Sequence, residues 1–117
     1  MRIIRDKISI DELKQMSAKM FGNLVKAVVD IEEAIMAVDA DMHADQEKLL
    51  LENGSVQKNL WGINLYPEFF SQDEFIEFDS MINLRSWQNN RSRGVEDENI
   101  RKKIVEVVDK LVKNNEL

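Results

Sequence analysis

The chain contains no cysteine, one histidine, one proline and four glycines among its 117 residues. Without cysteine, a disulfide framework, a thiolate nucleophile and a cysteine metal site are all excluded. The single histidine, His43, excludes a multi-histidine site within one subunit. So little glycine and proline leaves no low-complexity linker, and a chain of this length holds one ordinary hydrophobic core. A single domain over residues 1–117 is therefore expected.

Long apolar runs are also missing, and positive charge is in deficit. No segment approaches the length that crosses a bilayer, and the N-terminal residues lack an apolar signal region, which predicts a soluble cytoplasmic protein. The net charge of −6 repels phosphate backbones and anionic membrane surfaces. Neither nucleic acid nor a membrane is expected as a partner.

The N-terminal part of the chain predicts a short edge strand and a helix. Residues 2–5 suit the strand, and the apolar positions of residues 10–21 repeat at helical spacing. Ser9 and Glu12 have the spacing of a capping box at the start of this helix. Gly22 stands where a left-handed residue ends a helix.

Residues 24–38 fit both a helix and a strand. A high density of β-branched residues favours strands, and the alternation of apolar and polar residues that follows strengthens this interpretation. We therefore predict strands at 24–31 and 35–44, joined by a turn near Glu32-Glu33.

The second half of the chain predicts two further strands and a final helix. Asn53-Gly54 predicts a hairpin turn, and one-sided apolar patterns predict strands at 61–66 and 76–84. An apolar stripe between Glu96 and Lys113 predicts the last helix. The expected fold class is α+β: a single antiparallel sheet of about four to five strands, with an N-terminal and a C-terminal helix packed on one face.

A polar loop between the last predicted strand and the last helix is the leading candidate for a binding site. Guanidinium forks beside amide donors match phosphate and carboxylate groups. The expected anion-binding residues are Arg85, Asn90, Arg91 and Arg93. They indicate a binding module for a small anionic molecule or an acidic partner. The alternative is that these arginines pair with the protein's own carboxylates, such as Glu77 and Asp79, and are structural.

Polar residues on the predicted strands supply a wall for this site. If the strands at 61–66 and 76–84 pair as a hairpin, Asn64, Asp79 and Asn83 lie on the same polar face as Arg85. They would line a pocket or form a buried network.

His43 is the second candidate. With Asp41 and Asp45 at two-residue spacing it would share one strand face, which suits a divalent cation and a metal-dependent hydrolase. The alternative is a solvated histidine on a polar face. No sequence motif implies an organic cofactor, and the residues do not decide whether the protein is an enzyme.

A third hypothesis is an interaction subunit that pairs through a sheet edge, for example as a homodimer.

The segments MHADQEKLLLENGS, NLWGINLYP and FDSMINLRSWQNNRSRGVED resemble a small prokaryotic family of unknown function, from about Phe21 to the final helix. The resemblance implies a single cytoplasmic domain. It carries over no catalytic residue.

Overall fold

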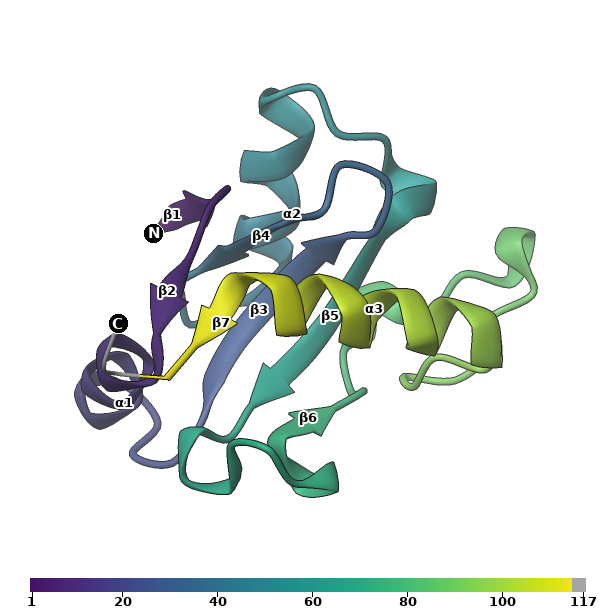
Figure 1. The fold of residues 1–117 in the computed structure, drawn as a ribbon. Helices are drawn as coiled ribbons and strands as arrows, with labels where there is room; N and C mark the ends of the chain where they lie inside the picture. The colour runs from purple at the N-terminus through teal and green to yellow at the C-terminus, as the bar shows by residue number, and fades with distance from the viewer. Residues whose placement is uncertain (115–117) are drawn as a thin grey trace.

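A computed structural model describes residues 1–114 of the chain (Figure 1). In chain order its strands and α-helices are β1 (Arg2–Ile4), β2 (Ile8–Ser9), α1 (Ile10–Lys19), β3 (Val25–Asp30), β4 (Ile35–Val38), α2 (His43–Glu52), β5 (Leu60–Leu65), β6 (Ile76–Glu77), α3 (Glu98–Leu111) and β7 (Val112–Lys113). The chain is thus an α+β protein.

Five strands form one antiparallel sheet in the order β1-β4-β3-β5-β6. The longest pairing joins β3 to β5 over six residue pairs, from Val25 opposite Leu65 to Asp30 opposite Leu60. Lys26 lies directly opposite Asn64 in this register. The strands β2 and β7 form a separate two-stranded parallel sheet.

Alternate residues of the central strands face two different hydrophobic clusters. Ala27 and Ile63 pack with Ile104 of α3, which crosses in front of β3 and β5 in Figure 1. Val28 and Leu60, on the other face, pack with Leu50 of α2. Helices therefore cover both faces of the sheet, because α2 lies opposite α3. Each fully buried aliphatic side chain contributes about 1.5–3 kcal/mol to stability.

The first and last helices were predicted correctly. The Ser9 hydroxyl accepts a hydrogen bond from the Glu12 amide at 3.1 Å, and Gly22 adopts a φ of 89° after the helix ends. Asp97 caps α3 by accepting from the amides of Asn99 and Ile100. The apolar stripe of α3 is buried, as its spacing indicated.

The predicted strand at 35–44 is wrong beyond Val38. Asp39 takes a left-handed φ of 66°, which ends β4, and the helix α2 begins at His43. The predicted hairpin at Asn53-Gly54 is also wrong, because Gly54 follows α2 with a φ of 100°. Burial of Leu50 against the second face of the sheet overrides the alternating pattern that favoured a strand.

The predicted strand at 76–84 shrinks to two residues in β6. The Ser80 hydroxyl accepts from the Ile82 amide at 3.2 Å and starts the 3₁₀ helix η4 (Met81–Asn83). Leu84, which stands on the apolar side of the predicted strand, is exposed. The side chains of Ser80 and Asn83 bond to backbone groups at this point, which favours the turn over a continued strand. The predicted strands at 2–5, 24–31 and 61–66 are confirmed as β1, β3 and β5.

Candidate functional site

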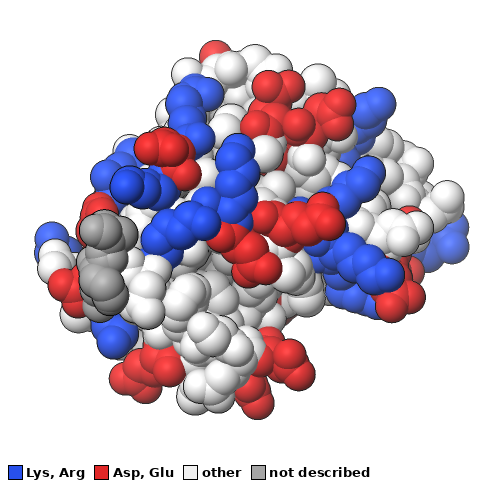
Figure 2. All heavy atoms as spheres, in the orientation of Figure 1, with Lys and Arg blue, Asp and Glu red and all other residues white. Residues whose placement is uncertain are grey.

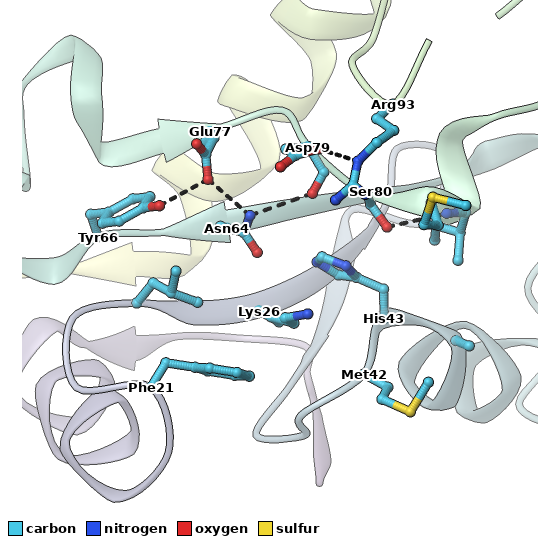
Figure 3. A pocket seen from close by; sticks show the side chains of 14 residues that line it. Phe21, Lys26, Met42, His43, Asn64, Tyr66, Glu77, Asp79, Ser80 and Arg93 are labelled. Carbon is cyan, nitrogen blue, oxygen red and sulfur yellow. Dashed lines mark hydrogen bonds and ion pairs between the residues drawn. The ribbon is translucent and has the colours of Figure 1, made fainter. Parts of the chain in front are cut away.

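One pocket of about 470 Å³ lies on the face of the sheet that α2 covers. We call it the α2 pocket; Figure 3 shows its side chains. Its lining residues are Phe21, Leu24, Lys26, Met42, His43, Ala44, Asn64, Tyr66, Glu77, Asp79, Ser80, Met81, Ile82 and Arg93. A second cavity of similar volume, between Phe70 and α3, has Asp73 and Asp109 as its charged lining residues. The α2 pocket is the better candidate because it gathers cationic, anionic and buried polar groups.

Lys26 and Asn64 form the floor of the α2 pocket. They are cross-strand neighbours on β3 and β5, so their side chains leave the same face of the sheet. The Lys26 ammonium lies 5.3 Å from the centre of the Phe21 ring. Among residues 1–114 it forms no ion pair. A cation without a carboxylate partner therefore borders the pocket.

The orientation of the Asn64 amide is fixed by its neighbours. Its Nδ2 donates to Glu77 Oε1 at 2.9 Å and to the Asp79 carbonyl at 3.4 Å. Because both partners are acceptors, the nitrogen must face them. The Asn64 Oδ1 consequently points the other way, toward the space that Lys26 and His43 border (Figure 3). This oxygen is buried and has no partner among the described residues, and the residue is only 7% exposed.

Two carboxylates stand beside Asn64. Glu77 Oε1 also accepts from the Tyr66 hydroxyl at 2.9 Å, and burial, followed by this hydrogen bond, raises the pKa of Tyr66. Asp79 Oδ1 accepts from Arg93 Nε at 2.7 Å. The wall opposite Lys26 therefore carries a chain of hydrogen bonds that ends in an exposed ion pair.

His43 is the first residue of α2 and is buried against β5. Its Nε2 lies 2.7 Å from the Ile63 carbonyl, an acceptor, so Nε2 carries the proton. Burial lowers the pKa of His43, the bond to Ile63 opposes this shift, and the nearby Lys26 charge adds to the lowering. At neutral pH the imidazole is uncharged, which leaves Nδ1 as an acceptor.

The N-terminus of α2 opens on the same pocket. Met42 holds the N-cap position and supplies no side-chain hydrogen bond. In the described chain the amides of His43 and Ala44 have no acceptor. Unsatisfied amides at the positive end of a helix attract anions.

Two residues of the predicted anion-binding loop are engaged within the fold. Arg85 is 4% exposed; its guanidinium donates to the carbonyls of Gln57 at 2.6 Å and Leu60 at 2.7 Å and stacks 4.0 Å from the Trp61 ring centre. Burial lowers the pKa of Arg85, although arginine stays charged. The Asn90 Nδ2 donates to the carbonyls of Asn83, Ser92 and Gly94. Arg85 therefore anchors the loop to the start of β5, and Asn90 fixes the loop's own conformation.

The other two loop arginines are on the surface. Arg91 is exposed, and its amide donates to Glu96 Oε2 at 2.8 Å. Arg93 lines the α2 pocket while it pairs with Asp79. Arg93 is thus the member of the loop that reaches the pocket.

The predicted pocket wall is divided. Asn64 and Asp79 line the α2 pocket. Asn83 does not; its Oδ1 accepts from the Gly62 amide at 2.9 Å and its Nδ2 donates to the Gly62 carbonyl at 3.0 Å. The side-chain amide of Asn83 thus makes the two hydrogen bonds to Gly62 that a neighbouring strand would otherwise make along this edge of β5.

The strand on which the metal hypothesis depended is absent. Asp41 precedes α2 and is exposed, Asp45 is exposed in its first turn, and His43 points to β5. No group of three His, Cys, Asp or Glu side chains within residues 1–114 is placed to hold a metal ion.

None of the helices within residues 1–114 combines the length and the apolar character that a membrane span needs.

Lys26 and the free end of α2 were missed by sequence reasoning. One signal was present, since Lys26 and Asn64 are each polar within strongly apolar strands. What could not be seen was their pairing, which depends on the register of β3 against β5.

A family model described as "Protein of unknown function (DUF5674)" matches residues 2–111 of the chain. The match starts nearer the N-terminus than the resemblance in the sequence suggested. No curated protein and no solved structure matches the chain.

Proposed function

We propose that this chain, which belongs to the family of proteins of unknown function matched over residues 2–111, is a binding module for a small anionic molecule. The anion sits in the α2 pocket. One observation carries the proposal: the Lys26 ammonium, which has no carboxylate partner within residues 1–114, borders the same pocket as the uncapped N-terminus of α2. Both features attract negative charge at one place.

The expected affinity is modest. A charge-assisted hydrogen bond contributes about 1.5–3 kcal/mol, and a helix N-terminus about 0.3–1 kcal/mol. Association costs at least about 4 kcal/mol, so the polar contacts alone give little net binding. Contact with the exposed Phe21 and Met42 adds apolar burial. A dissociation constant on the order of 1 mM is expected, which corresponds to a net binding free energy of about −4 kcal/mol.

Of the four loop residues predicted to bind the anion, only Arg93 lines the α2 pocket in this proposal. Arg93 supplies a second cation at the pocket wall, held in place by Asp79. Arg85 and Asn90 act indirectly, because their bonds to backbone carbonyls fix the loop that carries Arg93. Arg91 lies outside the pocket lining.

A lysine substitution tests the proposal. Isocaproate, a carboxylate with a branched apolar tail, is titrated by calorimetry into the unchanged protein and into Lys26→Met, which keeps the length of the side chain and removes its charge. We expect binding to the unchanged protein and at least a tenfold loss in Lys26→Met.

The matched control is Lys48→Met, the same change at an exposed position of α2 outside the pocket lining. It is expected to bind isocaproate as the unchanged protein does. Equal losses in the two variants would mean that general charge, not the pocket, attracts the anion. Absence of binding of every carboxylate probe, isocaproate and its α-amino analogue alike, to the unchanged protein would refute the proposal.

A further inference from the structure

We infer that the ligand of the α2 pocket is a zwitterion of the α-amino acid class, with an ammonium group beside its carboxylate and an apolar side chain. This inference rests on the proposed function and specifies its ligand. The Asn64 Oδ1, the two carboxylates beside it and the apolar rim of the pocket each contribute one requirement.

The first requirement is a hydrogen-bond donor. The Asn64 Oδ1 is a buried acceptor that has no donor among residues 1–114, and it points into the pocket (Figure 3). A buried acceptor without a donor is unfavourable, so native structures rarely keep one where no ligand or water supplies the bond. A carboxylate has no hydrogen to give. The ligand therefore carries an N–H or O–H group in addition to its anionic group.

The second requirement is a positive charge on that donor. Glu77 and Asp79 line the same wall, and each uses one carboxylate oxygen in the bonds to Asn64, Tyr66 and Arg93. The pocket thus presents two cations, Lys26 and Arg93, and two anions. A purely anionic ligand would meet repulsion from this wall, whereas an ammonium group beside Asn64 is attracted by it.

The third requirement is an apolar part. The pocket rim includes three exposed apolar side chains, Phe21, Met42 and Met81, which come from three separate segments of the chain. Methionine side chains adapt to ligands of different shape. An aliphatic side chain fits between them, with the carboxylate toward Lys26 and α2 and the ammonium toward Asn64.

Three matched probes separate these requirements in the full-length protein. L-leucine carries both charged groups, isocaproate lacks the ammonium, and isoamylamine lacks the carboxylate. We expect L-leucine to bind at least about tenfold more tightly than isocaproate, because a site built to hydrogen-bond a group discriminates against the analogue that lacks it. Isoamylamine is expected to bind more weakly than either.

The outcomes distinguish the two proposals. Equal affinities for L-leucine and isocaproate would overturn the zwitterion and leave the anion site standing. Binding of isoamylamine in preference to isocaproate, or no binding of any probe, would overturn both. Because these measurements use the unchanged protein, they do not depend on whether a variant folds.

Two variants identify the residues responsible. Asn64→Leu is expected to reduce the affinity for L-leucine to that for isocaproate. Glu77→Gln keeps the oxygen that accepts from Asn64 and Tyr66 but removes the charge, so L-leucine is expected to bind at least threefold more weakly and isocaproate no more weakly than before. Glu74→Gln, at an exposed residue outside this pocket, is the control. A preference for L-leucine over isocaproate that is as large in both variants as in the unchanged protein would overturn the assignment.

Discussion

At the scale of single residues, two asparagines that look alike in the sequence have different roles. Asn64 and Asn83 were both predicted to line a pocket or to form a buried network; Asn64 lines the α2 pocket, and Asn83 belongs to a buried network. The Asn83 amide instead bonds to both backbone groups of Gly62 and to the Arg93 carbonyl. Local pattern shows that such residues are polar, but it cannot show whether an amide faces a ligand or a buried backbone.

Replacement of Asn83 by alanine is expected to destabilise the fold by about 2–4 kcal/mol, because it leaves the buried amide and carbonyl of Gly62 without partners. Urea denaturation measures the change. Asn99→Ala, at an exposed position in the first turn of α3, is the control and should change stability by less than about 0.5 kcal/mol. A similarly small effect at Asn83 would contradict the bridging role.

His43 predicts a dependence of stability on pH. Its pKa is lower in the folded protein than its ordinary value of about 6.5, so below that pH the unfolded chain binds more protons. The free energy of unfolding therefore falls as the pH drops below about 6.5, at no more than about 1.4 kcal/mol per pH unit. The measurement is urea denaturation of the unchanged protein and of His43→Gln at pH values from 7.5 to 5.5, about one unit on either side of 6.5. It gives the fall in the free energy of unfolding for each protein. An equal slope in His43→Gln would exclude His43 as its source.

At the scale of elements, the least predictable part was the covering of the second face of the sheet. The strand β5 and the helices α1 and α3 follow from periodicity and caps, and β3 follows from its density of β-branched residues. By contrast, α2 and the segment 78–84 alternate like strands, and their structure is decided by what they cover. Tertiary contacts override local pattern here, as they often do for short segments.

The close packing of η4 on β5 predicts the effect of a methyl group at Gly62. A Cβ at this position would lie 2.5 Å from the Cβ and from the Oγ of Ser80, and both distances are shorter than a contact between non-bonded atoms. Gly62→Ala is therefore expected to lower the melting temperature and to cost about 1–3 kcal/mol. Gly94→Ala is the control, since the nearest atom there is 3.4 Å away. Equal stability of the two variants would show that η4 does not pack on Gly62.

At the scale of the whole molecule, the sequence sufficed for the fold class and the family, and it did not suffice for the site. The α2 pocket requires the register of β3 on β5, the start of α2 and the position of Arg93, which come from separate parts of the chain. The binding of an anionic ligand, first proposed for the arginine loop, remains a proposal, and its proposed site is centred on Lys26.

Over the face that carries α3, basic and acidic side chains are intermixed (Figure 2).

The edges of the sheet predict a monomer. The edge strands β1 and β6 have three and two residues, and Arg2 and Glu77 place charges on them. Short, charged edges disfavour pairing between molecules, and the net charge of −6 adds repulsion. Sedimentation at high concentration is expected to give 13.6 kDa. Twice that mass would favour the homodimer of the third hypothesis.

The most direct test of the anion site is a map of amide chemical shifts while isocaproate is titrated into isotope-labelled protein. The largest changes are expected at the amides of His43 and Ala44, together with a change at the Lys26 ammonium. Changes centred on Arg91, or spread over the surface without a maximum at the start of α2, would contradict the placement of the ligand in the α2 pocket.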